Sequence, residues 1–399
     1  MFFSIDKTKQ ENFVCDFQFD NFFISVDFGW ETYETEKHVV IYKGYADYHH
    51  LRDLLDELIT ETEPSRTGNY CAIVYHKTDN TISIKSDRYR SFPIYLNNGN
   101  KVTNLVKQDR TAWTDSLITI TDNFEIIENK FDAIGTIDVS TISLEYGIES
   151  IASILDRKTK SLIDLRSSLP MAFRKPIHTF LSGGVDSLLV YSFLQKHTQD
   201  YKLIKYAHVD YTDFWLMNSG DIVDNWGYKQ IHHWINPCIL TSGAPGDEFM
   251  LRSPVTANIF LQNNGTDLLK MNQDVTSLHY SYFSLPKHKK VVENLASDFE
   301  VNKNLNKKEL IWKLCNIIIN DWQHWHIENT LTWTPLRDLE IFKIILQMPY
   351  EVQIKQIFDS YISKRLISDI NPQFVNLISH QKNTASMMSN LINFYRQHH

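Results

Sequence analysis

Two short polar loops, each placed directly after an apolar run, contain the residue types in this chain that are suited to chemistry. The first loop is SGGVDS, residues 182–187, and it follows the apolar run of residues 177–181. Its adjacent glycines, Gly183 and Gly184, allow the backbone to approach an oxyanion closely and to take positive φ. Helix N-termini also favour anions, and a carboxylate such as Asp186 is a ligand for a Mg²⁺ ion that bridges phosphates. The loop therefore predicts a cradle for magnesium pyrophosphate.

Three further residues belong to this predicted cradle. Ser182 and Ser187 offer hydroxyl donors to an oxyanion, and Leu181 ends the strand that precedes the loop. An ordinary strand-to-helix turn is the alternative, with Ser-Gly-Gly as turn chemistry and Asp186 as a helix cap. The complete SGGVDS string after an apolar strand favours the cradle.

The second loop is TSGAPGDE, residues 241–248, and it follows the apolar residues 238–240. An aspartate at the end of a second parallel strand can reach the same metal ion as Asp186 across the carboxyl edge of a sheet. Asp247 is therefore predicted to be the second metal ligand. A simple Gly-Pro turn is the alternative for this loop.

The elements that must position these loops alternate as strand and helix. Residues 177–181 predict a strand, residues from about 185 an amphipathic helix, and residues 203–209 a second buried strand. A helix at 219–226 and a strand at 230–235 continue the rhythm that is expected of a doubly wound parallel sheet.

The part of the chain before these loops has a different pattern. From about residue 12 to residue 132, short β-like runs alternate with turns, and residues 48–58 predict an amphipathic helix. Residues 68–76 and 81–86 flank a polar turn and therefore predict a β-hairpin. This region predicts a β-rich domain.

Length and composition restrict the function classes. A chain of 399 residues predicts two or three domains, and 43% hydrophobic with 22% charged residues is typical of a soluble globular protein. The formal charge of −8 argues against a general nucleic-acid binder, because no basic excess neutralises phosphates. The four cysteines form no C-x-x-C pair, which favours buried thiols in a reducing cytosol over zinc or disulfides. No apolar run approaches about 18 residues and the N-terminus is no signal peptide, so we expect a cytoplasmic protein that does not span a membrane.

The SGGVDS string resembles the PP-loop of the ATP pyrophosphatase superfamily, in which ATP is split to AMP and pyrophosphate. It differs from the G-x-x-x-x-G-K-S/T P-loop, so cleavage between the β- and γ-phosphates is not expected. The second loop resembles the S-G-E-G-x-D-E loop of class B, glutamine-hydrolysing asparagine synthetases, in which Ser-Gly contacts AMP and Asp holds magnesium. Ser242, Gly243, Asp247 and Glu248 match that loop. The resemblance thus implies ATP and Mg²⁺ as cofactors, with Asp186 and Asp247 as metal ligands.

The same family provides three weaker correspondences. Val209 falls at the strand end that lies against the adenine in the family. Residues 334–349 resemble the family's R-x-P-F-x-D helix, and a helix cap is the alternative role for Asp338. Lys382 falls where the family has a lysine that neutralises pyrophosphate and the pentacoordinate transition state. An exposed lysine at a helix end is the alternative for Lys382.

Residues 68–96 are similar to the core of the glutaminase domain of asparagine synthetases, an Ntn-hydrolase sandwich of two sheets between helices (αββα). That chemistry needs a cysteine directly after the initiator methionine, with the freed α-amino group as base. This chain has Phe2 there, and nothing before Cys15 suggests a cleavage site. The resemblance therefore implies a retained fold with an inactive glutaminase.

The predicted organisation is an α+β domain followed by an α/β domain. Residues 1–135 form the Ntn-like domain without its nucleophile, and residues 136–169 a linker and a leading helix with helical segments at 150–155 and 160–169. Residues 170–399 form the PP-loop synthetase domain, a doubly wound parallel sheet with added helices.

Two departures from the family bear on the reaction. Ala244 stands where the family has a glutamate that acts in proton transfer, and a methyl group is no base. Only residues 236–240 separate the strand at 230–235 from the second loop, so the family's aspartate-binding helices are missing, or rebuilt from residues 251–254 and the helix after them. Both departures favour a product other than asparagine.

The expected activity is amide ligation. A carboxylate attacks the α-phosphorus of ATP, giving an acyl-adenylate and magnesium pyrophosphate, and ammonia or an amine then displaces AMP. The expected substrates are a small-molecule or peptide carboxylate and ammonia or an amine, and a homodimer stays open. The alternatives are intramolecular amide formation, as in β-lactam synthetases and lasso-peptide cyclases, and a nucleotide-binding pseudoenzyme. Adenylating tRNA-modifying enzymes are a further alternative, although the sequence lacks the cysteine pairs and basic additions typical of them.

Overall fold

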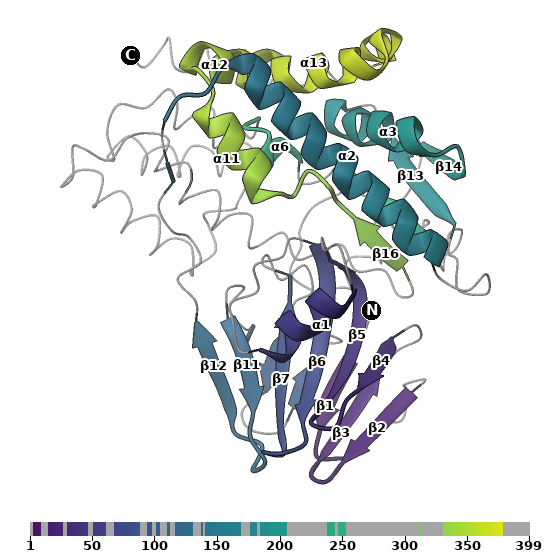
Figure 1. Ribbon diagram of the computed structural model, residues 1–399, viewed down its shortest axis with the longest axis vertical. Coiled ribbons are helices and arrows are strands. Elements are labelled where there is room, and N and C mark those ends of the chain that lie inside the picture. The colour runs from purple at the N-terminus through teal and green to yellow at the C-terminus, as the bar shows by residue number, and fades with distance from the viewer. Residues whose placement is uncertain are drawn as a thin grey trace, which may run out of the picture.

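The computed structural model describes residues 3–8, 15–26, 30–46, 51–60, 68–87, 94–97, 101–103, 110–111, 116–130, 137–138, 140–168, 176–181, 184–205, 238–243, 246–252, 312 and 330–377. Strands in these ranges form two six-stranded antiparallel sheets and one four-stranded parallel sheet, accompanied by helices (Figure 1). The chain is thus a mixed α and β protein. Within the described ranges, no helix combines the length and the apolar character needed to cross a membrane.

The two antiparallel sheets are built from the N-terminal third of the chain. The first has the order β10 (Arg110–Thr111), β8 (Tyr95–Asn97), β9 (Lys101–Thr103), β1 (Phe3–Asp6), β3 (Phe22–Val26) and β2 (Cys15–Phe19). The second has the order β12 (Ile126–Lys130), β11 (Ser116–Ile120), β7 (Thr81–Ser86), β6 (Gly68–His76), β5 (His38–Ala46) and β4 (Glu31–Glu34). The hairpin predicted at 68–76 and 81–86 is confirmed, because β6 and β7 pair antiparallel and His76 lies opposite Thr81.

Strand β6 contributes to two hydrophobic cores, because successive side chains of a strand point to opposite faces of its sheet. One set of its residues joins the core between the two sheets, and this set is Cys71, Ile73 and Tyr75. The alternate set packs with helix α1 (Leu51–Ile59), and this set is Tyr70, Ala72 and Val74. Helix α1 therefore covers the outer face of the second sheet.

Four parallel strands form the third sheet, in the order β14 (Tyr201–Lys205), β13 (Ile177–Leu181), β15 (Cys238–Thr241) and β16 (Thr330–Trp333). The strand predicted at 177–181 is confirmed, and the strand expected from residue 203 begins at Tyr201. From β13 the chain adds β14 on one side and later β15 on the other, so the direction of strand addition reverses between β13 and β15. In open α/β sheets, ligands bind at the carboxyl ends of the strands that flank such a reversal.

Helices pack with this parallel sheet in one hydrophobic core. They are α2 (Leu144–Ser168), α3 (Val185–His197), α6 (Gly246–Phe249), α11 (Leu339–Gln347), α12 (Tyr350–Asp359) and α13 (Tyr361–Ile370), followed by the 3-10 helix η3 (Pro372–Leu377). Helix α2 contacts α3, α11 and α13, and strand β16 also contacts β5 and β6 of the antiparallel part (Figure 1).

Helix α2 is a single helix, whereas the sequence predicted separate helical segments at 150–155 and 160–169. Two polar residues in the supposed gap are buried inside the fold. Lys158 Nζ lies 2.5 Å from Asp338 Oδ2, and Thr159 Oγ1 donates to the carbonyl oxygen of Leu155 (2.7 Å). Because each polar group has a partner, the helix continues through a stretch that looked like a break.

Candidate functional site

The candidate site lies where β13 and β15 end, at the reversal of strand order. Gly184 is the N-cap residue of α3 with extended backbone (φ −84°, ψ 157°), and Asp186 lies in the first turn of that helix. Ser187 Oγ donates to the carbonyl oxygen of Gly184 (2.9 Å). The second loop leaves β15 at Ser242, whose amide donates to the carbonyl oxygen of Trp333 at the end of β16 (3.0 Å). Both loops therefore start from paired strands at one edge of the sheet.

Two glycines let the second loop pack directly on the start of α3. A Cβ atom at Gly243 would lie 2.4 Å from both the carbonyl carbon of Asp186 and the amide nitrogen of Ser187. A Cβ atom at Gly246 would lie 2.6 Å from Cγ of Asp186. These positions accept no side chain without movement, and their close packing places Asp186 beside Asp247.

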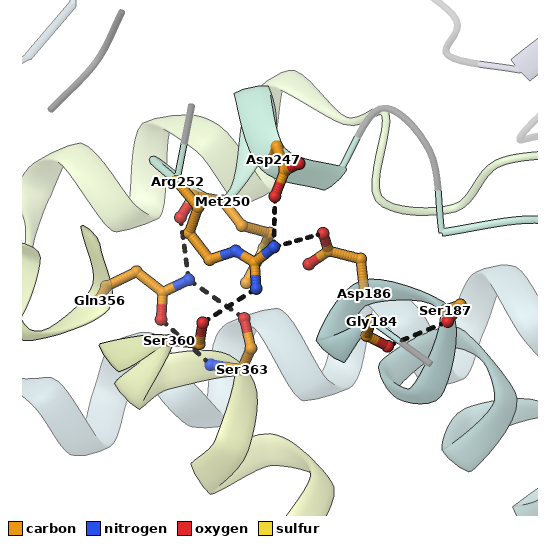
Figure 2. Close-up of polar contacts among 9 residues, drawn as sticks. All are labelled: Gly184, Asp186, Ser187, Asp247, Met250, Arg252, Gln356, Ser360 and Ser363. Atoms are coloured by element: carbon orange, nitrogen blue, oxygen red, sulfur yellow. Dashed lines mark hydrogen bonds and ion pairs between the residues drawn. The ribbon is translucent and has the colours of Figure 1, made fainter. Parts of the chain in front are cut away.

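The side chain of Arg252 joins the two loops (Figure 2). Its Nη2 atom donates to Oδ2 of Asp186 (2.9 Å) and to Oδ1 of Asp247, and its Nη1 atom donates to Oγ of Ser360 (2.9 Å). The side chains of Arg252 and Asp186 are 8% and 13% exposed, whereas that of Asp247 is 53% exposed. One guanidinium thus binds a buried carboxylate and an exposed carboxylate at the same place.

Two residues with left-handed backbone position these contacts. Leu251 (φ 57°) follows α6, and after it the amide of Arg252 donates to the carbonyl oxygen of Asp247 (2.6 Å). Ser360 (φ 56°, ψ 36°) lies between α12 and α13 and caps both helices. Residues other than glycine adopt this conformation rarely, and strained backbone concentrates at functional sites.

The buried side chain of Gln356 ties the junction of α12 and α13 to the second loop. Its Nε2 atom donates to the carbonyl oxygen of Met250 (2.9 Å) and to Oγ of Ser363 (3.1 Å). Its Oε1 atom accepts from the amides of Ile362 (2.7 Å) and Ser363 (3.2 Å). These four bonds hold the turn on which Ser360 lies against the second loop.

Asp186 is electrostatically perturbed. Burial raises the pKa of Asp186 to about 7; Arg252 acts against this rise and Asp247 adds to it. Oδ1 of Asp186 is buried, and it has no hydrogen-bond partner within the described ranges. A buried carboxylate is ionised at low cost only beside a cation or donors, so the site favours a positively charged ligand.

Asp186 and Asp247 fit a hard divalent cation such as Mg²⁺. Their carboxylates reach one guanidinium nitrogen, and proteins typically hold Mg²⁺ with one or two carboxylates together with waters and phosphates. No group of three or more His, Cys, Asp or Glu side chains suited to a metal occurs in the part of the chain that the structure describes. The pair therefore suits a metal ion whose remaining ligands are waters and nucleotide phosphates. Two carboxylates are too few for a structural metal site made of protein side chains alone.

The structure brings together six of the predicted site residues, which are Gly184, Asp186, Ser187, Ser242, Gly243 and Asp247. Leu181 ends β13 immediately before them. Four predicted residues lie outside the described ranges, namely Ser182, Gly183, Val209 and Lys382, and Ala244 and Phe2 do so as well. The hydroxyl of Ser187 is already used within its own loop, since it donates to Gly184.

Asp338 has the role that the sequence offered as the alternative, a helix cap. Its Oδ1 atom accepts from the amides of Glu340 (2.7 Å) and Ile341 (3.1 Å) at the start of α11. Its Oδ2 atom is paired with Lys158. Both oxygens are therefore used inside the fold.

Arg252 was predicted only as part of the segment 251–254, which could replace the family's aspartate-binding helices. Its contact with the predicted metal ligands was not predicted. Its partners Asp186 and Ser360 are 66 and 108 residues away, so no local pattern marks the contact. The only local signal was its position five residues after Asp247, beyond the end of the short helix α6.

A comparison with models of known protein families finds none that matches this chain. A comparison with curated proteins likewise finds no match.

Proposed function

We propose that this chain is an ATP-dependent amide ligase of the asparagine synthetase type, which forms AMP and pyrophosphate and does not use glutamine. The observation that carries the proposal is the convergence of Asp186 and Asp247 on one guanidinium nitrogen. The two aspartates follow adjacent parallel strands, β13 and β15, at the reversal of strand order where nucleotides bind in open α/β sheets.

Each element of the site has a role in the proposed reaction. Asp186 and Asp247 would hold Mg²⁺, which when bound neutralises charge on the phosphates. The N-terminal turn of α3, from Gly184, would bind pyrophosphate oxygens with its amides. Gly243 keeps the loops close enough for both aspartates to reach one ion. The carboxylate substrate attacks the α-phosphorus and pyrophosphate leaves; the amine then attacks the acyl carbon, loses a proton and expels AMP.

The antiparallel part supports the proposal of an Ntn-like domain that has lost its activity. Two six-stranded sheets pack face to face, and helix α1 covers the outer face of one of them. Phe2 takes the place of the nucleophilic cysteine that such glutaminases need. We therefore expect ammonia or an amine, and not glutamine, as the source of nitrogen.

The parallel part supports the proposal of a PP-loop synthetase domain with a doubly wound sheet. Strand β13 precedes the SGGVDS loop, and helix α3 begins within that loop at Val185. The cofactors of this proposal are ATP and Mg²⁺.

The test is ATP–pyrophosphate exchange with Mg²⁺ across a panel of carboxylic acids. Wild type is expected to exchange label only with the correct acid, and Asp186→Ala to lose the exchange. Asp369→Ala is the matched control, because Asp369 lies in an exposed ion pair on α13 and should leave the exchange unchanged. Absence of exchange with every acid, despite ATP binding, would contradict the ligase proposal.

One observation favours a second candidate, a nucleotide-binding pseudoenzyme. Arg252 already neutralises part of the charge on both proposed metal ligands. A pseudoenzyme of this kind binds ATP without releasing pyrophosphate. Intramolecular amide formation, as in β-lactam synthetases and lasso-peptide cyclases, belongs to the first proposal and differs from it in the source of the amine. A substrate that carries both the acid and the amine separates the two forms.

A further inference from the structure

The guanidinium of Arg252 occupies the point at which the two carboxylates of the site converge (Figure 2). A single nitrogen, Nη2, donates to Asp186 and to Asp247, and the arginine side chain is only 8% exposed. The contact with Asp186 is therefore a buried part of the site and not a solvent-exposed ion pair.

We propose that Arg252 is a resident counter-cation, which a divalent metal must displace before it binds Asp186 and Asp247. The inference rests on the proposed function in one respect, since it takes these two aspartates as the metal ligands. It adds that metal binding without nucleotide is suppressed, and that nucleotide phosphates relieve the suppression.

Charge explains the competition. When both are ionised, the two carboxylates carry two negative charges and the guanidinium neutralises one of them, whereas a divalent ion neutralises both. A metal ion bound to the same two carboxylates would lie close to the guanidinium, and the two cations would repel each other. Either cation therefore excludes the other from Asp186 Oδ2.

The backbone around Arg252 holds it in this position in advance. Leu251 (φ 57°) and Ser360 (φ 56°) are two of the residues other than glycine for which the structure records positive φ. One precedes Arg252, and the other accepts a hydrogen bond from its Nη1 atom. Gln356 fixes the turn that carries Ser360. A side chain that needed only solvent contacts would not require these constraints.

A nucleotide changes the balance because it brings phosphates. Arginine binds phosphate with two parallel hydrogen bonds, so a displaced Arg252 gains a partner only when phosphate enters the site. Metal alone offers no such partner. Nucleotide and metal are therefore expected to bind cooperatively, and by linkage each raises the affinity of the other by the same factor.

The experiment measures Mn²⁺ binding to the full chain by electron paramagnetic resonance of the free ion, without nucleotide and with α,β-methylene-ATP. Arg252→Met should bind Mn²⁺ without nucleotide about tenfold more tightly than wild type, which is a typical coupling. The nucleotide should tighten Mn²⁺ binding about tenfold in wild type and clearly less in Arg252→Met.

Two matched variants control the measurement. Arg365→Met removes an exposed arginine from α13 and should bind Mn²⁺ like wild type. Ser360→Gly removes the short side chain whose hydroxyl accepts from Nη1, and glycine tolerates the left-handed backbone at this position. The variant should therefore fold and bind Mn²⁺ with intermediate affinity. The Ser360 variant keeps the test decisive if Arg252→Met does not fold.

The outcomes separate this inference from the ligase proposal. Equal or weaker Mn²⁺ binding by Arg252→Met and Ser360→Gly overturns the competition, whatever the exchange assay gives. Tighter binding by both variants upholds the competition, even where no acid supports exchange, and the ligase proposal then fails alone. Absence of Mn²⁺ binding in every variant, with or without nucleotide, overturns both.

Discussion

Replacing Gly243 with alanine tests whether the close packing of the two loops sets the site. The new Cβ atom would lie 2.4 Å from the carbonyl carbon of Asp186 and from the amide nitrogen of Ser187, and 2.7 Å from the carbonyl oxygen of Asp186. All three are backbone atoms at the start of α3, so they cannot rotate away as a side chain can.

The magnitude follows from the movement that is required. Ordinary contact begins at 3.4 Å, so the loops must separate by 3.4 − 2.4 = 1.0 Å. Overpacking of this kind costs about 1–3 kcal/mol of folding free energy. A displacement of about 1 Å in a catalytic constellation also costs on the order of 100-fold in rate. We therefore expect a moderate loss of stability and a much larger loss of ATP–pyrophosphate exchange.

Gly147→Ala is the matched control. A Cβ atom at Gly147 would lie 2.2 Å from Cε of Met348, which is closer than any contact at Gly243. That atom, however, is the flexible end of the Met348 side chain. Gly147 lies in helix α2, where alanine is favoured over glycine by about 1 kcal/mol, which offsets the repacking of Met348. The net change should stay within about 1 kcal/mol.

Urea denaturation followed by tryptophan fluorescence gives the stability of both variants, and exchange gives their activity. A Gly243→Ala variant that matches wild type in both measurements would contradict the close packing of the two loops. A Gly147→Ala variant that loses as much stability as Gly243→Ala would contradict it too, because the identity of the contacted atoms would then not matter.

Three further predictions concern buried polar groups. Lys158→Met leaves the carboxylate of Asp338 buried without its cation and should lower the free energy of unfolding, measured in urea, by about 3–5 kcal/mol. Adding Asp338→Asn should recover most of that loss, because asparagine still caps α11. Gln356→Leu leaves the carbonyl of Met250 without its donor and should cost at least about 2 kcal/mol in the same assay. The pKa of Asp186 rises from 3.8 to about 7 on folding. Between these two pH values the folded, metal-free protein keeps a proton on Asp186 that the unfolded chain has lost. The free energy of unfolding should therefore fall by at most about 4 kcal/mol as pH rises from 3.8 to 7. Melting temperatures in EDTA should show this fall in wild type but not in Asp186→Asn, and equal pH dependence in the two would contradict the assignment.

The sequence predicted those strands and helices that are marked by turn residues and apolar runs nearby in the chain. Strands β6 and β7 alternate across a polar four-residue turn, and the hairpin appears with the predicted bounds. The run 177–181 and the helix after Gly184 were also predicted, because glycine and an apolar strand punctuate the sequence there. Asp186 and Asp247 were predicted to be ligands of one metal ion, which stays a prediction. The structure brings both carboxylates to one guanidinium nitrogen, because the carboxyl ends of adjacent parallel strands lie at one edge.

What the sequence could not predict depends on partners far along the chain. The sequence predicted helical segments at 150–155 and 160–169 and left residues 156–159 between them, whereas α2 runs through these residues. The partner that buries Lys158 is Asp338, 338 − 158 = 180 residues later. Arg252 meets its partners through left-handed backbone at Leu251 and Ser360, which are residue types without a preference for that conformation.

The order of strands in the parallel sheet has a consequence for the time course of folding. Ile177 of β13 pairs with Tyr201 of β14 across 201 − 177 = 24 residues, whereas Cys238 of β15 pairs with Thr330 of β16 across 330 − 238 = 92 residues. The longer loop costs about 1.2 kcal/mol more closure entropy, so β13, α3 and β14 should assemble before β16 joins.

On the ribosome the delay becomes longer. Among the described residues, the last fully buried member of the antiparallel core is Phe124, and the last fully buried member of the core around the parallel sheet is Ile367. These residues are 367 − 124 = 243 positions apart, which corresponds to roughly 12–50 s of synthesis. Once α2 and α3 have been synthesised, their apolar faces lack α11 and α13 until these two helices emerge. A translation stop within the interval would release a chain with one finished core and one open core, a species that chaperones retain and proteases remove.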